Sequence, residues 1–243
     1  MRKIGQGIGI LLFTLLLWQV AAIVLASPIL PYPVQVIRHF CGALSGSLPV
    51  HIAYSLMRIG LSVIASIIIG LPLGIIIGYS PSLSRWLSPF LYLSYPIPKL
   101  ALLPIIMLLF GLGEVSKTIM IFLILFFPIT IDITGSVRAM DKEIFQTMKA
   151  FGVNDMAIAR RVILPGIFPA ILDSLKVSLG ISLSILFFAE NYGTQHGLGY
   201  YIMNSWQKMD YINLYTGIFT LAMLGFILFL ILDFIDDRVS AWR

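Results

Sequence analysis

Long stretches without a charged residue constrain this chain more than any other feature. The longest runs from Ile4 to Ile37, and a second stretch of 26 residues separates Arg58 from Arg85. A helix needs about 20 mostly apolar residues to cross the roughly 30 Å hydrocarbon layer of a bilayer. In the whole chain 59% of the residues are apolar and 11% are charged, too few charges to cover a soluble core. The sequence therefore predicts a membrane protein and excludes a soluble enzyme, a disordered chain and a disulfide-stapled secreted domain.

Six segments are long and apolar enough to cross a bilayer, so we expect an all-α polytopic protein. They cover residues 7–27, 57–79, 87–110, 118–136, 172–189 and 214–233. The alternative for the first segment is a cleaved signal peptide, because Arg2 and Lys3 precede it and Ala26 ends it. Its apolar stretch is longer than a signal peptide needs, which favours a retained helix. Since the connections are short, we expect residues 1–243 to form a single transmembrane domain.

The distribution of Lys and Arg over the connections predicts the orientation of the chain. With the N-terminus inside, the inner segments contain Arg2, Lys3, Arg85, Arg138, Lys142, Lys149, Arg160, Arg161, Arg238 and Arg243. The outer segments contain only Arg38, Lys117 and Lys208. We therefore expect both termini in the cytoplasm. The same bias accounts for the net charge of +5, which does not indicate a nucleic-acid partner.

Small residues at every fourth position form a strip along the second span. They are Ser62, Ser66, Gly70, Gly74 and Gly78. Such a strip lets the backbone of another helix approach closely, so we expect helix packing here, with a direct contact to a ligand as the alternative. The fifth span repeats the pattern with Ser174, Ser178 and Ser182. Ser178 and Ser182 are also candidates for the lining of a translocation path.

Prolines interrupt the third span at Tyr95-Pro96-Ile97-Pro98-Lys99. Each proline removes a backbone donor, and broken backbone within a membrane is tolerated only against protein or a water-filled cavity. Tyr95, Pro96, Pro98 and Lys99 are therefore candidates for a translocation path. The alternative for Lys99 is that its ammonium group reaches the inner membrane surface.

Acidic residues near the ends of the later spans allow several interpretations. Glu190 ends the fifth span, and we expect it either to line an outer vestibule or to be a solvated end charge. Asp132 and Asp173 are expected to form structural pairs with Arg138 and Lys176, and a proton relay is the alternative. Asp236 and Asp237 are expected in a solvated tail.

The inner connection 141–165 has the pattern of a helix, a glycine turn and a second helix. Asp141 is expected to cap the first helix and Asn154 the second, and Gly152 stands where a helix end favours a left-handed residue. Leu164-Pro165 is expected to close the second helix. Apolar residues fall on one face of each helix. This pattern favours a docking element for a soluble partner, and an amphipathic helix on anionic lipid is the alternative.

The same connection resembles the "EAA" loop of the ABC-transporter permeases, the membrane subunits of binding-protein-dependent importers. The family pattern is Glu-Ala-Ala, three residues, Gly, nine residues, Ile, any residue, Leu-Pro. In this chain Gly152 is followed by nine residues and then by Val162-Ile163-Leu164-Pro165. Gln146, Thr147 and Met148 stand at the Glu-Ala-Ala positions.

Two further pieces are similar to permeases for nitrate, sulfonates and taurine. They are Pro96-Ile97-Pro98-Lys99 with Pro104, and Ala189-Glu190 followed by Gly197-Leu198-Gly199-Tyr200. The resemblance covers residues 50–235. Nitrate, sulfonates, taurine, bicarbonate and a vitamin precursor are all substrates that it allows.

The resemblance implies a MetI-like permease fold in the cell inner membrane. It also implies a permease dimer, most simply a homodimer, with two cytoplasmic ATPase subunits and an extracytoplasmic solute-binding protein. The residues it assigns to the ATPase contact are Lys149, Phe151, Gly152, Asn154, Asp155, Met156, Arg160, Arg161, Leu164 and Pro165. The function that follows is the transmembrane path of an importer; an ion-coupled secondary transporter and a non-transporting scaffold are the alternatives.

Motifs for catalysis or cofactor binding do not occur in the sequence. It has no G-x-x-x-x-G-K-[ST] phosphate loop, so ATP hydrolysis is expected on a partner chain, and no catalytic residue or cofactor is expected here. The spacing of His39, Cys41, His51 and His196 fits no compact metal motif, so no metal site is expected.

Overall fold

The computed structural model describes the backbone of residues 2–239 and the side chains of residues 12–238. All regular structure within these residues is helical, which confirms the all-α class. Arg2, Lys3 and Arg243, which entered the orientation argument, lie outside the described side chains, as does the beginning of the predicted first span. The chain forms two compact units. One comprises the residues up to 55 together with 190–224, and the other comprises residues 56–189 and those from 225 onward.

The first unit contains α1 (Arg2–Leu25), α2 (Pro33–Ala43), the start of α3 (Leu48–Tyr79), α10 (Leu198–Gln207) and the start of α11 (Tyr211–Val239). Trp18 joins α1 to its neighbours. Its indole Nε1 donates to the carbonyl oxygen of Pro31 at 3.1 Å, and its ring lies 5.7 Å from the ring of Tyr215. Phe40 of α2 packs edge-on against Phe219 of α11.

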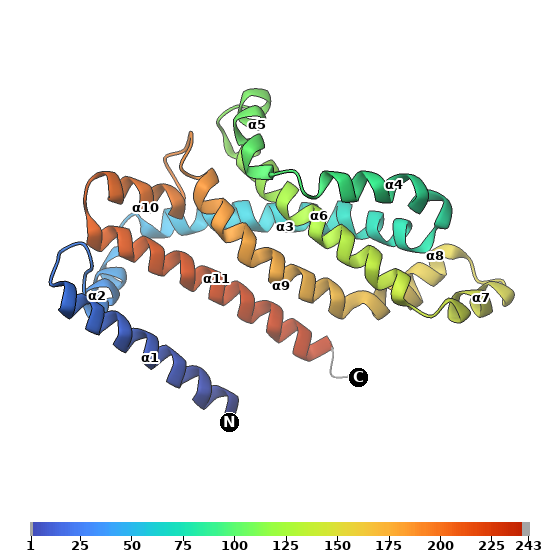
Figure 1. The fold of residues 1–243 in the computed structure, drawn as a ribbon, viewed down its shortest axis with the longest axis horizontal. Helices are drawn as coiled ribbons and strands as arrows, with labels where there is room; N and C mark the ends of the chain where they lie inside the picture. Colours follow the sequence, from blue (N-terminus) through green and yellow to red (C-terminus); the bar gives the residue numbers. More distant parts are fainter. Residues whose placement is uncertain (1, 240–243) are drawn as a thin grey trace. The chain divides into compact units, whose positions relative to one another are not determined.

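The second unit contains the rest of α3 and α11 and all the helices between α3 and α10 (Figure 1). These are α4 (Pro81–Ser94), the 3-10 turn η1 (Lys99–Leu102), α5 (Leu103–Phe110), α6 (Glu114–Ala139), α7 (Lys142–Ala150), α8 (Asp155–Ile158), the π-helical turn η2 (Ala159–Ile163) and α9 (Leu164–Ala189). Buried apolar side chains of α5 and α6 form one cluster, and those of α3, α4 and α6 form another. Helix α6 is therefore central to this unit.

Four helical stretches among the described residues are long and apolar enough to span a membrane. They are Leu48–Tyr79, Glu114–Ala139, Asp155–Ala189 and Tyr211–Arg238. The predicted third span, residues 87–110, consists of two helices bent by 83° at the proline-rich break, and counting them as one broken span raises the number to five. The described part of α1, Leu12–Leu25, is a shorter apolar helix.

The predicted end of a helix at Leu164-Pro165 is wrong, because α8, η2 and α9 form one continuous helix from Asp155 to Ala189. Leu164 donates its N–H to the carbonyl oxygen of Ala159, five residues earlier, which is a π-helical bond. A proline ring normally clashes with the carbonyl group four residues before it. The wider π turn just before Pro165 gives room for that ring, so the helix continues through the proline.

The strip of small residues on α3 faces α6. Ser62 donates to the carbonyl oxygen of Thr118 at 2.9 Å, and Ser66 donates to that of Phe122 at 3.3 Å. Further along, a Cβ atom added at Gly70, Gly74 or Gly78 would lie 2.8, 2.7 or 2.6 Å from atoms of Thr130, Ile133 and Val137, respectively. Two helices in such close contact pack backbone against backbone.

Candidate functional site

The connection after α6 forms a capped helix, a tight turn and a second capped helix. The side chain of Asp141 accepts the N–H of Glu143 at 2.9 Å, and that of Asn154 accepts the N–H of Ala157 at 2.7 Å. Gly152 lies between the helices with φ of +75°, a conformation that a side chain with a Cβ atom rarely adopts. The local sequence therefore fixes the geometry of this connection.

Contacts with the end of α3 hold the base of the connection in place. The hydroxyl of Tyr79 donates to Oδ1 of Asp155 at 2.7 Å, and Lys149 Nζ lies 3.4 Å from the same oxygen. Lys149 Nζ also lies 5.0 Å from the centre of the Tyr79 ring, and the Phe145 ring packs edge-on against that ring. The Tyr79 hydroxyl and then the Asp155 carboxylate raise the pKa of Lys149 above its ordinary value, so this lysine is cationic at neutral pH.

The turn itself presents apolar side chains to the surroundings. Phe151 is 81% exposed and Met156 is 64% exposed, although both belong to a rigid, anchored segment. Arg160 and Arg161 are exposed beside them, whereas Leu164 is partly buried at the start of α9. An exposed aromatic ring next to exposed cations on a rigid support is typical of an interaction surface.

The proline-rich break is closed by its own lysine. Lys99 Nζ donates to the carbonyl oxygen of Ser94 at 2.6 Å and to that of Tyr95, and it lies 4.4 Å from the centre of the Phe127 ring. These carbonyl groups end α4 and lack a partner within the helix. Tyr95, Pro96 and Pro98 are exposed. Lys99 therefore caps α4, a role that neither of its two predicted interpretations included.

The two serines proposed for a path lie inside the second unit. Ser178 and Ser182 of α9 are both buried. Ser182 Oγ donates to the carbonyl oxygen of Leu179, whereas Ser178 Oγ is the one buried side-chain N or O atom without a hydrogen-bond partner among the described residues.

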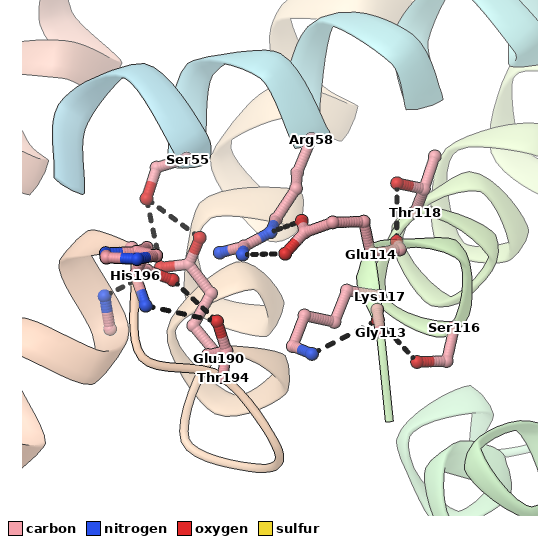
Figure 2. Close-up of polar contacts among 12 residues, drawn as sticks. Ser55, Arg58, Gly113, Glu114, Ser116, Lys117, Thr118, Glu190, Thr194 and His196 are labelled. Carbon is pink, nitrogen blue, oxygen red and sulfur yellow. Dashed lines mark hydrogen bonds and ion pairs between the residues drawn. The ribbon is translucent and has the colours of Figure 1, made fainter. Parts of the chain in front are cut away.

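Glu190 is fully buried in the first unit, so its interpretation as a solvated end charge is wrong. Its carboxylate accepts a hydrogen bond from Ser55 Oγ at 2.8 Å (Figure 2). It accepts another from the N–H of Gly199 at 2.7 Å. Ser55 Oγ in turn accepts the N–H of Leu198. Gly199 lies in the first turn of α10, where a negative charge is favourable. Glu190 and Ser55 therefore fix the start of α10.

Sequence reasoning did not find an ion pair between a buried arginine and a half-buried glutamate in the second unit. Arg58 of α3 is fully buried, and its Nε and Nη2 atoms donate to the two carboxylate oxygens of Glu114 at 2.5 and 2.7 Å (Figure 2). Lys117 is also buried and donates to the carbonyl oxygens of Leu112 and Gly113. The pair holds α3 to the first turn of α6. Two residues 56 positions apart give no local pattern in the sequence.

The expected pairing of Asp132 and Asp173 with Arg138 and Lys176 is not what the structure has. Lys176 pairs with Asp233 at 2.6 Å and with Asp236 at 2.9 Å, so Asp236 is not part of a solvated tail. Asp132 accepts a hydrogen bond from Ser174 at 2.7 Å. Arg138 donates to the hydroxyl groups of Ser84 and Ser88.

Histidines in the first unit make structural contacts. His39 Nε2 lies 2.9 Å from Oδ1 of Asn213, and His51 Nδ1 lies 3.1 Å from the backbone nitrogen of Gly197. Within the described part of the chain, no three His, Cys, Asp or Glu side chains gather in a way that would hold a metal ion.

Long apolar helices joined to a rigid, exposed connection define a polytopic membrane protein with a surface for a partner. The profile of one family, described as binding-protein-dependent transport system inner membrane component, matches residues 70–242. The chain belongs to this family.

Relatives over the whole length agree with this assignment. The taurine transport system permease protein TauC of Escherichia coli strain K12 is 32% identical over 250 residues, which cover 100% of this chain and 91% of that protein. A Bacillus subtilis strain 168 protein, SsuC, which has the name of an aliphatic sulfonates transport permease, is 31% identical, with coverage of 100% and 90%.

A solved structure shares the fold. A chain of the MetNI methionine ABC transporter in an inward-facing conformation matches with a TM-score of 0.59 and 20% identity. The match covers 79% of this chain and 94% of that chain. This chain therefore has the MetI-like fold that the sequence resemblance implied, and it is a multi-pass membrane protein.

The function predicted from the resemblance is confirmed at the level of the family. The chain is the transmembrane permease subunit of an ABC importer, which forms the path for a small solute. Such permeases work with an ATPase and a solute-binding protein as partners. An ion-coupled secondary transporter and a membrane scaffold are not favoured.

Proposed function

We propose that residues 141–165 are the element through which two cytoplasmic ATPase subunits drive this permease, one subunit for each copy in a homodimer. The exposure of Phe151 and Met156 on an anchored support is the observation behind this proposal. Burying two such side chains in a groove of a partner would remove a large apolar area from water, and aromatic residues of this kind dominate binding energies.

The route of the motion follows from the continuous helix. A displacement of Met156 in α8 passes through η2 into α9 without an intervening loop. Helix α9 packs along α6, and α6 packs on the small-residue strip of α3. Closure of the two ATPase subunits would then move these spans as a rigid body and alternate access between the two sides of the membrane.

The proposed location is the cell inner membrane. The proposed topology has six spans, with both termini in the cytoplasm. Helix α1 supplies the first span, and α4 with η1 and α5 supplies a broken third span. The excess of Lys and Arg in the segments placed inside supports this orientation. We treat residues 1–243 as one membrane domain in which the exposed break at Tyr95, Pro96 and Pro98, with Ser178, Ser182 and Glu190, contributes to the path or its support.

A small organosulfonate is the proposed substrate class. The two relatives of highest quoted identity are named for taurine and for aliphatic sulfonates, and both match over the full length of this chain. The test is to reconstitute the permease with its ATPase and binding protein and to compare ATP hydrolysis with taurine, an alkanesulfonate, nitrate and a formylaminopyrimidine. Stimulation by either sulfonate supports this class, and stimulation by nitrate or the pyrimidine alone refutes it.

Copurification tests the docking role. Phe151→Ala should reduce the amount of ATPase that copurifies with the permease in mild detergent about tenfold or more, as expected for a central aromatic contact. Phe226→Ala is the matched control, because Phe226 is 59% exposed on α11 and lies away from the segment in sequence. Equal ATPase recovery with both variants would refute the assignment.

A further inference from the structure

Residues 141–165 are called the docking segment below. A basic hollow of about 550 Å³ lies at this segment in the second unit. It is bounded by the end of α3, the start of α4, the end of α6 and one side of α7. Its polar lining consists mainly of Tyr79, Ser84, Arg138, Lys142, Gln146 and Lys149. We call this feature the basic hollow.

The basic hollow lies level with the ends of two membrane-spanning helices. Tyr79 is the last residue of α3, and Arg138 lies in the last turn of α6. Figure 1 shows α7 next to the end of α6. The ends of spans lie at the depth of the lipid headgroups, where tyrosine and basic side chains gather. Its cytoplasmic position rests on the orientation proposed above.

Three cations line the basic hollow, and no carboxylate is among its described lining residues. Arg138 is held in place because its guanidinium group donates to Ser84 and Ser88. Lys149 lies 3.4 Å from Asp155, which is outside the lining. Lys142 forms no ion pair among the described residues. Its neighbour Asp141 accepts the N–H of Glu143, and neither Asp141 nor Glu143 lines the hollow.

One of these cations lies at a position that is unfavourable for folding alone. Lys142 is the first residue of α7, where the helix dipole disfavours a positive charge. Gln146 occupies the position at which the "EAA" pattern has a glutamate, so the wall of the hollow lacks a negative charge that would balance Lys142. A cation without an ion pair, at a helix position that its charge does not stabilise, indicates a ligand of opposite charge.

The chemistry of the lining fits a phosphate group. An arginine fixed by two hydroxyl groups and two lysines supply charge-assisted donors, and phosphate oxygens accept several such bonds at once. Basic pockets between spans on the cytoplasmic side suit the headgroups of anionic lipids. We propose that the basic hollow binds the phosphate group of an anionic ligand, supplied either by an anionic phospholipid or by free phosphate.

This site would connect the membrane to the docking segment. Arg138 belongs to α6, whereas Lys142 and Lys149 belong to α7, so a bound phosphate would bridge a span and the segment proposed above to contact the ATPase. Binding would stiffen α7 against α6 and thereby favour transmission of the ATPase movement.

Native mass spectrometry of the full-length chain in detergent tests the proposal. The probes are dioctanoyl phosphatidylglycerol, dioctanoyl phosphatidylcholine as the neutral lipid, and inorganic phosphate. Phosphatidylglycerol should bind at least fivefold more tightly than phosphatidylcholine, and Lys142→Gln and Gln146→Glu should each weaken its binding about fivefold. Lys208→Gln is the matched control, because it removes one exposed cation from the first unit.

The arms of the experiment separate the two sources of phosphate. Displacement of the lipid by millimolar inorganic phosphate assigns the site to free phosphate, and retention of the lipid assigns it to the phospholipid. Equal binding of both lipids, or equal loss in Lys208→Gln, overturns the proposal. Gln146→Glu keeps the size of an exposed side chain. It therefore tests the proposal even if Lys142→Gln fails to fold. The assay needs no nucleotide or transport, so its outcome is independent of the ATPase-docking proposal.

Discussion

The contact between α3 and α6 gives the sharpest prediction, which concerns one added methyl group at Gly74. In Gly74→Ala the new Cβ atom would lie 2.7 Å from Ile133 Cγ2, 2.8 Å from Ile133 Cβ and 2.9 Å from the carbonyl oxygen of Thr130. Ordinary contacts begin at 3.4 Å. A rotation of the Ile133 side chain does not relieve the clash with its Cβ or with the Thr130 backbone, so the two helices must separate.

The cost of that separation is about 1–3 kcal/mol, the usual range for an overpacked contact. Gly60→Ala is the matched control, because Gly60 lies on the same helix and has no atom within 4 Å of an added Cβ. Both variants gain the same helix propensity, so their difference isolates the clash. The free energy of unfolding is measured by titration with sodium dodecyl sulfate in mixed micelles, with circular dichroism as the readout. If the two variants differed by less than about 0.5 kcal/mol, the helices would not be packed at this distance.

Three further predictions concern the docking segment and the Arg58–Glu114 pair. Gly152→Val forces a β-branched residue to positive φ, at a cost of about 1–3 kcal/mol, and should raise the amount of ATP hydrolysed per solute transported. Gly152→Asn should leave this ratio unchanged, because asparagine tolerates this φ. An unchanged ratio in the valine variant would contradict the coupling role. Asn154→Ala removes a helix cap worth about 0.5–2 kcal/mol and should speed hydrogen exchange at the Ala157 amide, whereas equal exchange would mean that the cap is dispensable. Glu114→Gln weakens the charge-assisted hydrogen bonds to Arg58 and should lower the free energy of unfolding by about 1.5–3 kcal/mol in the same detergent titration. An unchanged free energy of unfolding would show that the pair does not stabilise the fold.

Local features of the fold were predictable from the sequence because each depends on a few neighbouring residues. Asp141 and Asn154 cap the helices that their side chains predicted, and Gly152 has the positive φ expected of a helix end. A cap or a turn is decided within about one helical turn, so no knowledge of the rest of the chain is needed.

Features that depend on distant partners were not predictable in the same way. The small-residue strip showed that α3 packs closely on a neighbour, but one face of one helix does not reveal which helix that is. Lys176 was assigned to a nearby carboxylate, whereas its partners, Asp233 and Asp236, lie on α11. Glu190 was given a solvated alternative because its partner Ser55 lies 135 residues earlier in the chain.

The error at Leu164-Pro165 has a different cause. Proline is a strong helix breaker in a regular α-helix, and the prediction assumed regular geometry. A single π turn changes the position of the carbonyl group that the ring would meet, and the sequence pattern of such a turn is weak. The π turn at Ala159–Ile163 is therefore the reason that the helix is continuous and that the predicted helix end is wrong.

That continuity has a mechanical consequence. The 35 residues from Asp155 to Ala189 form a single helix about 50 Å long, and its α9 part packs against α6. A tilt of about 5° around one end displaces the other end by about 4 Å, more than the width of a water molecule. Under the docking role proposed above, a tilt of this size, driven from residues 141–165, would be enough to open or close a passage for a small solute at the far end of the helix.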